Sequence, residues 1–141
     1  MKRKHDLLRN VLTDIEEGIR NGINTDTLAK KHTLSSIHLQ RLFKFAFKQS
    51  LGAYIRSRRL AASLESLLGT NSKLINIALD YGFEYEQSYL RSFKREFGVT
   101  PGIIRKTGQT VKVTPPLNLH DSNIIENDIM FEPDMVMVAE Y

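Results

Sequence analysis

Two copies of a seven-residue pattern, Arg-x-Phe-Lys-x-x-Phe, supply the side chains in this sequence that are best suited to bind a polyanion. Within each copy the two Phe are four positions apart and share one helix face, whereas the Arg and the Lys, three positions apart, share another. One face can pack against the protein while the other meets the anionic partner. The eight residues are Arg41, Phe43, Lys44 and Phe47 in the first copy and Arg91, Phe93, Lys94 and Phe97 in the second.

A single copy of this pattern would have a plainer explanation, because charged side chains usually cover the solvent face of an amphipathic helix. The second copy lies fifty residues after the first, and a matching short helix is predicted before each. Duplication of a whole basic helical module favours a shared binding role over two unrelated solvated faces.

Residues suited to catalysis or metal binding form no such pattern. The sequence has no Cys, which excludes a thiolate metal site, a Cys nucleophile and a disulfide framework. His38 would be considered as a base, but on a helix beside Leu39 and Arg41 it is better explained by packing or by a phosphate contact. Metal-ligand spacing and a glycine-rich phosphate loop are missing. We therefore expect no enzyme activity, no metal and no cofactor.

The composition is that of a globular chain. Its 141 residues, 41% of them apolar, can form one ordinary domain or two small helical ones. The lack of Cys suits a reducing interior, so a cytoplasmic location is expected. The basic start at residues 1–5 resembles part of a signal peptide, but charged residues interrupt the segment that follows. No segment is long and apolar enough to span a bilayer, and we predict no membrane partner.

Charge is distributed unevenly along the chain. Residues 1–106 carry 19 Lys and Arg against 10 Asp and Glu, a balance of +9. Residues 107–141 carry one Lys against six acids, a balance of −5, and the two parts sum to the net charge of +4. The first part is therefore the one expected to bind an anionic partner.

Apolar residues at three- and four-residue steps predict an all-α fold. Two short helix pairs, each with a tight turn and a basic second helix, are typical of helix-turn-helix units. The second turn is one residue longer, because Ala29 precedes Arg41 by twelve positions and Ala78 precedes Arg91 by thirteen. The predicted helices are 6–21 ending at Gly22, 24–32 capped by Asn24, 35–47 capped by Ser35, the long connector 51–68, one capped by Asn71 or Ser72 and closed by Gly82, and 85–97.

The tail has a different character. After a short basic helical turn near Arg105, residues 108–119 contain Pro115 and Pro116 and predict an extended linker. Residues 136–139 form a strand-like apolar run, which is not stable alone. This run either begins a second domain beyond residue 141 or pairs with another chain, and a frayed terminus is an equally good explanation. We divide the chain into a double helix-turn-helix domain at 1–106 and, at 107–141, a linker with the possible first strand of a C-terminal domain.

Three segments carry a family resemblance: residues 36–44 (SIHLQRLFK), 50–59 (SLGAYIRSRR) and 81–101 (YGFEYEQSYLRSFKREFGVTP). They resemble the DNA-binding domain of the AraC/XylS transcription regulators, most closely the group of MarA, SoxS and Rob, over about residues 6–106. The resemblance implies a regulator, most often an activator, that binds an asymmetric promoter site as a monomer through two recognition helices in adjacent major-groove segments. It also implies RNA polymerase as a partner and, in a Rob-like arrangement, a GyrI-like small-molecule effector domain beyond residue 141.

The resemblance further implies which side chains meet DNA, with Gln suited to an adenine edge and Arg to a guanine edge. Ile37 stands where close relatives have Trp, so its contact would be apolar, and Glu86 replaces a Gln, so the second helix either reads different bases or binds mainly backbone. The implied base contacts are Ile37, Gln40 and Arg41 in the first recognition helix and Glu86, Gln87, Ser88, Leu90 and Arg91 in the second, and the implied phosphate contacts are Ser36, Lys44 and Lys94.

An alternative from a different class is an interaction module that acts mainly through RNA polymerase or another protein, with DNA binding secondary. Salt dependence of duplex binding separates the two, because phosphate neutralisation makes affinity fall steeply with added salt.

Overall fold

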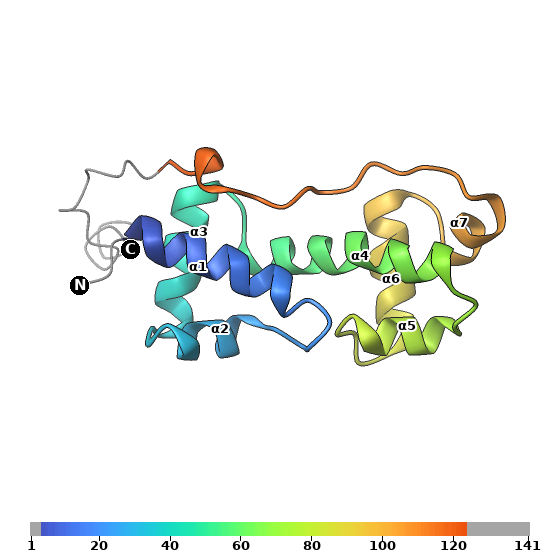
Figure 1. The fold of residues 1–141 in the computed structure, drawn as a ribbon, viewed down its shortest axis with the longest axis horizontal. Coiled ribbons are helices and arrows are strands. Elements are labelled where there is room, and N and C mark those ends of the chain that lie inside the picture. Colours follow the sequence, from blue (N-terminus) through green and yellow to red (C-terminus); the bar gives the residue numbers. More distant parts are fainter. Residues whose placement is uncertain (1–3, 124–141) are drawn as a thin grey trace. The chain divides into compact units, whose positions relative to one another are not determined.

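Residues 4–123 are described by the computed structural model, and they form seven α-helices and one 3₁₀ turn without a strand (Figure 1). The predicted all-α class is thereby confirmed, whereas the strand-like run at 136–139 lies outside the described residues. The elements are α1 (Lys4–Glu17), α2 (Thr25–Lys31), α3 (Ser36–Phe47), α4 (Leu51–Gly69), α5 (Leu74–Asp80), α6 (Glu86–Phe97), α7 (Pro101–Thr107) and η1 (Leu119–Asp121).

Contacts group the described residues into two compact units. Unit 1 contains residues 4–17, 24–54 and 116–123, and unit 2 contains residues 18–23 and 55–115. Each unit holds one of the two helix pairs, α2 with α3 in unit 1 and α5 with α6 in unit 2. The two units are a division by contacts, and the boundary at residue 106 stays a prediction.

Unit 1 is built around the apolar face of α1. Leu8, Val11 and Ile15 are buried there, as the three- and four-residue spacing predicted, and α1 contacts both α2 and η1. On α3, Phe43 is fully buried, with ring centroids 5.5 Å from Tyr54 of α4. The core of unit 1 therefore joins α1, the helix pair and the first turn of α4.

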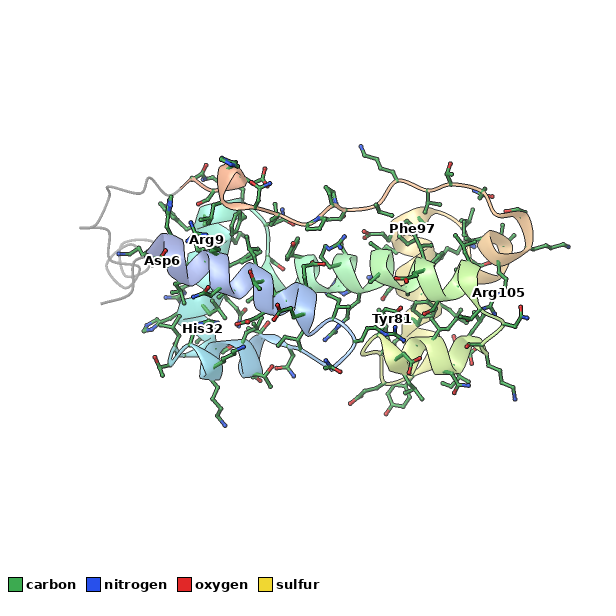
Figure 2. All side chains as sticks on the ribbon, viewed as in Figure 1. Asp6, Arg9, His32, Tyr81, Phe97 and Arg105 are labelled. Carbon is green, nitrogen blue, oxygen red and sulfur yellow. The ribbon has the colours of Figure 1, made fainter. Side chains whose placement is uncertain are left out.

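A polar contact fastens α1 to the end of α2. The carboxylate of Asp14 lies 2.7 Å from Nε2 of His32 and 2.9 Å from Nζ of Lys31, and Figure 2 shows His32 where α2 ends. Burial raises the pKa of Asp14, but hydrogen bonds and charge from Lys31 and His32 outweigh it, so the net shift is below the ordinary value. The charged form of Asp14 is thus favoured by the fold.

Unit 2 packs its helix pair against α4 through buried tyrosines. The hydroxyls of Tyr89 and Tyr81 lie 2.9 Å from Oγ of Ser63 and Ser66, respectively, on α4. Ser63 is itself buried and donates to the Leu60 carbonyl at 2.7 Å. Burial raises the pKa of Tyr89 above its ordinary value, so the phenol stays neutral and hydrogen-bonded. These bonds fix the orientation of α5 and α6 on α4.

Arg105 of α7 closes the end of α4 (Figure 2). Its guanidinium donates to the carbonyls of Leu67 at 3.0 Å, Ser72 at 2.8 Å and Thr70 at 3.2 Å. The last carbonyls of a helix have no partner within the helix, and the guanidinium supplies one to Leu67 while holding the segment that leads to α5. The basic turn predicted near Arg105 is therefore a helix with a structural role.

Two predicted helix ends are wrong. The first helix ends at Glu17, four residues early, because residues 18–23 form a turn in which the Asn21 and Ile23 amides both donate to the Gly18 carbonyl. Neither Asn71 nor Ser72 caps α5; the N-cap is Lys73, without a side-chain hydrogen bond. The Ser72 carbonyl is instead occupied by Arg105.

The predicted linker has no helix or strand over residues 108–118, and its last predicted residue, Leu119, begins η1. In unit 2, Arg58 donates to the Thr114 carbonyl. In unit 1, the Leu117 amide donates to the Tyr54 hydroxyl at 2.8 Å and the Asn123 amide to the Ala46 carbonyl at 2.8 Å. The linker is therefore hydrogen-bonded to the helices of each unit.

Candidate nucleic-acid interface

The first helix of each pair ends with the same geometry, although the second turn is one residue longer, as predicted, and the module occurs twice. In the first, Thr33 has a φ of 56° and the Leu34 amide donates to the Ala29 carbonyl at 2.9 Å. In the second, Gly82 has a φ of 89° and the Phe83 amide donates to the Ala78 carbonyl at 2.9 Å. A left-handed residue and a bond spanning five residues are the usual end of a helix. The same ending directs both α3 and α6 away from the helix before it.

The left-handed position has different residues in the two turns. Gly82 also makes a close approach, since a Cβ there would lie 2.9 Å from Nε of Arg59 on α4. Burial lowers the pKa of Arg59, with a further contribution from Arg56, and Arg59 donates to the Ile23 carbonyl. Glycine is therefore required in the second turn on two counts, backbone conformation and space.

The Phe pairs of the duplicated pattern face the core, as predicted. Ring centroids lie 4.8 Å apart for Phe43 and Phe47 and 4.7 Å apart for Phe93 and Phe97. Three of these four rings are buried, and Phe97 is half-buried. Lys44 and Lys94 are exposed, so each recognition helix has an apolar inner face and a basic outer face.

On α3 the exposed residues are Ile37, Gln40 and Lys44. Ile37 is 57% exposed, so its side chain is accessible to a partner. Gln40 donates from Nε2 to Oγ of Ser36 at 2.9 Å, so two predicted contact residues are held together. Arg41 is half-buried and takes part in an interaction within the protein.

On α6 the exposed residues among those predicted are Gln87, Arg91 and Lys94. Three other predicted base contacts, Glu86, Ser88 and Leu90, are half-buried. Tyr85 is the N-cap without a side-chain hydrogen bond. The acid at Glu86, in the first turn, stabilises the positive end of the helix dipole that the missing cap leaves exposed.

The exposed faces of α3 and α6 are therefore not equivalent. Gln40 is exposed on α3, but Leu90, fifty residues later, is half-buried. Arg41 is half-buried, but its counterpart Arg91 is exposed. Both helices therefore turn the same side inward, with Phe43 and Phe93 buried and Lys44 and Lys94 exposed, but they differ in the exposure of these two neighbouring positions.

One exposed residue beside these was missed by the sequence analysis. Arg95 lies four positions after Arg91 and is exposed on the same face of α6. It falls outside the repeated pattern, because α3 has Phe45 at the equivalent position. The spacing of the two Arg was the signal that would have found it.

Within residues 4–123, His, Asp and Glu side chains never gather in a group of three that would hold a metal ion. None of the helices in that range combines the length and apolarity needed to cross a bilayer.

Comparison with known proteins gives a consistent family. A family described as a helix-turn-helix domain matches residues 28–107. The chain is 33% identical over 135 residues to the transcriptional regulator Rob of Salmonella typhimurium, covering 94% of this chain and 47% of Rob. It is 37% identical over 99 residues to the regulatory protein SoxS of the same organism, covering 70% of this chain and 92% of SoxS. The chain thus spans about half the length of Rob and nearly all of SoxS.

The fold also matches a solved structure. The C-terminal domain of AraT, a response regulator from Geobacillus stearothermophilus, superposes with a TM-score of 0.69 and 22% identity, covering 84% of this chain and 99% of that domain. At this identity the likeness concerns the fold. The family match over residues 28–107 and the match to SoxS over almost its whole length agree with the two helix pairs and their basic outer faces. The chain therefore belongs to the AraC/XylS family of DNA-binding transcription regulators, in the group of MarA, SoxS and Rob.

Proposed function

We propose that this chain is a transcription activator that binds an asymmetric promoter site as a monomer, with α3 and α6 in adjacent major-groove segments. One observation supports the proposal above others: both recognition helices expose Lys and polar side chains opposite their buried Phe pairs. An exposed basic helix face is the complement of a phosphate-lined groove. A cytoplasmic location follows from this choice of partner.

Base reading is assigned first to α3. Gln40 is suited to an adenine edge, Arg41 to a guanine edge and Ile37 to a thymine methyl, and each good bidentate pair gives about 1–3 kcal/mol of discrimination. On α6 the proposed base contacts are Glu86, Gln87, Ser88, Leu90 and Arg91, of which Gln87 and Arg91 are the exposed members.

Phosphate contacts set the register of the protein on the duplex. We assign them to Lys44 and Lys94, which are exposed at equivalent positions, and to Ser36 at the start of α3. The first turn of α3 adds backbone N–H groups and the positive end of the helix dipole. This part of the interface carries affinity and little sequence preference.

A salt titration tests DNA binding directly. Affinity for a duplex is measured between about 50 and 200 mM salt, where a protein with several phosphate contacts loses orders of magnitude in affinity. Steep weakening supports the proposal. Flat or absent binding would instead support the alternative in which the chain acts mainly through a protein partner.

Selection of bound sequences from a random duplex pool tests the asymmetric site. Two recognition helices with different exposed faces should select two unlike half-sites in fixed order, about one helical turn apart. A symmetric palindrome would contradict the monomer proposal. RNA polymerase, as the protein partner of an activator, is tested separately by co-binding on the selected duplex.

A small-molecule effector domain beyond residue 141 is also proposed, by analogy with Rob, of which this chain matches 47%. Its test is whether the source reading frame continues past Tyr141 into a sequence that folds as a separate domain. A stop codon there would contradict it.

A further inference from the structure

Four side chains on the outer face of α6 surround a small open hollow of about 170 Å³. Arg91 and Arg95 are both exposed, and Ser88 and Ser92 are half-buried. The positions follow the three- and four-residue spacing of one helix face. The residues lining the hollow are Ser88, Arg91, Ser92 and Arg95.

Two Arg four positions apart are unfavourable in an isolated helix, because like charges at this spacing repel by a few tenths of a kcal/mol. The carboxylate of Glu96, the acid next to Arg95, accepts instead from Ser57 at 3.2 Å and from Thr114 at 3.4 Å, both in unit 2. Across the described residues, no hydrogen bond or ion pair joins either Arg to an acid. The charges are therefore available to an external anion.

The first copy of the module provides an internal comparison. Subtracting fifty from each position of the hollow leads to His38, Arg41, Leu42 and Phe45 on α3. Leu42 is buried, and the other three are half-buried. The first copy has no hollow lined by two Arg and two Ser. An amphipathic helix of this kind can therefore pack without these four side chains.

The donors around the hollow fit a tetrahedral oxyanion. A guanidinium presents N–H groups in a planar fork that matches phosphate oxygens, and a serine hydroxyl adds one further donor. Arg95 supplies charge, Ser88 and Ser92 supply hydroxyls, and Arg91 borders the hollow with donors left over for a base edge. The acids nearest in sequence, Glu86 and Glu96, are not part of its lining.

We propose that this hollow binds one backbone phosphate of the DNA, with Arg95 and Ser92 as the residues that fix α6 on the duplex. This site rests on the proposed DNA-binding function and adds Arg95 and Ser92 to its phosphate contacts. It predicts that α6 has, besides the phosphate contact assigned to Lys94, one more strongly held phosphate, for which α3 has no equivalent.

The test compares Arg95→Ala with Lys106→Ala, a matched control that removes an exposed positive charge from α7 of the same unit. Arg95→Ala should weaken binding about tenfold on every duplex, equivalent to the loss of one charge-assisted hydrogen bond, and reduce the salt slope by about 0.9. Lys106→Ala should change both much less. Arg95→Lys should recover the slope but only part of the affinity, because a point charge replaces a fork.

A duplex series with one neutral methylphosphonate at a time locates the phosphate. At one position, the neutral linkage should weaken binding of the native protein but should weaken binding of Arg95→Ala no further. Ser92→Ala should be least sensitive to the neutral linkage at that same position. Thermal unfolding checks folding, and we expect Arg95→Ala to stay close to the native stability, because relief of the repulsion with Arg91 offsets the loss of a cation at the C-terminal end of the α6 dipole.

Two failures are distinguishable. If the native protein binds no duplex, the proposed function is overturned. If it binds with a steep salt slope but Arg95→Ala matches Lys106→Ala, or if no methylphosphonate position is shared, only the phosphate site is overturned.

Discussion

Thr33 and Gly82 occupy equivalent left-handed positions, and a β-branched side chain is poorly suited to that conformation. Thr33→Gly should therefore stabilise unit 1 by about 1 kcal/mol, net of the loss of its 2.6 Å hydrogen bond to the His32 carbonyl and of added chain entropy. Chemical denaturation followed by helix signal measures the change. An unchanged or lower midpoint would show that the Thr hydroxyl matters more than backbone strain.

The reverse substitution, Gly82→Ala, should destabilise unit 2. The new Cβ meets Arg59 Nε at 2.9 Å and the φ of 89° disfavours any side chain, so a loss of at least about 1–2 kcal/mol is expected. The same denaturation experiment measures it. A neutral result would mean that Arg59 moves aside without cost.

Arg41 and Lys44 lie three positions apart on α3 but are assigned different tasks. Arg41→Ala should relax preference at one base pair by about 1–3 kcal/mol, while Lys44→Ala should weaken all duplexes about equally and lower the salt slope by about 1. Binding to a duplex set with single base-pair changes, repeated at two salt concentrations, separates the effects. Identical behaviour of the two variants would reject the division between base and phosphate contacts.

At the scale of elements, α6 begins without a side-chain cap. Tyr85 is 66% exposed and its hydroxyl gives the helix no acceptor at its N-terminus. Tyr85→Ser should stabilise unit 2 by about 1 kcal/mol, the usual contribution of a serine cap, and should raise the unfolding temperature. Tyr85→Ala, which removes the ring and adds no cap, is the control. An equal rise in unfolding temperature for both variants would mean that loss of the ring, and not the new cap, causes the effect.

The attachment of α1 to α2 should depend on acid. The pKa of Asp14 is lowered in the fold from 3.8, against the effect of its burial, by Lys31 and His32. A depressed folded pKa contributes stability that is present above about pH 3.8 and is lost as the pH falls through the lower, folded value. Asp14→Asn should be less stable at neutral pH and should lose less on acidification, measured by denaturation at a series of pH values. Parallel curves for the two proteins would contradict this.

The elements themselves were largely predictable, for reasons that particular residues show. Asn24 and Ser35 were recognised as caps because their side chains accept from the backbone three residues on, and they do so at 2.9 and 3.1 Å. The first helix was predicted too long because Ile19 is buried and continues the apolar spacing although the helix ends at Glu17. The caps at Asn71 and Ser72 failed because Arg105, more than thirty residues later, takes the Ser72 carbonyl.

The candidate interface was predictable in kind but not in orientation. Spacing placed Phe43 and Phe93 inside and Lys44 and Lys94 outside, and both placements are correct. Spacing did not reveal that Leu90 is half-buried while Gln40 is exposed, since that depends on how each helix rotates against its neighbours. Tertiary packing, through contacts such as Tyr89 with Ser63, decides it.

At the scale of the whole molecule, one chain contains both recognition helices. We therefore expect a complex of one chain with one duplex, which sedimentation of the mixture would measure at concentrations well above the dissociation constant. Two chains on one selected site would contradict the proposed monomer. The basic balance of +9 over residues 1–106 against −5 over 107–141 further predicts that DNA protects the first part from proteolysis more than the second.

The unlike outer faces of α3 and α6 have a consequence for engineering new specificities. A substitution that retargets α3 at Gln40 cannot simply be copied into α6 at Leu90, because Leu90 is half-buried where Gln40 is exposed, so the grafted amide would be less accessible to a base. The repeat duplicates the helix-turn-helix architecture, but the pairing of side chains with bases must be determined separately for each half. On α6, the positions to vary first are Gln87 and Arg91.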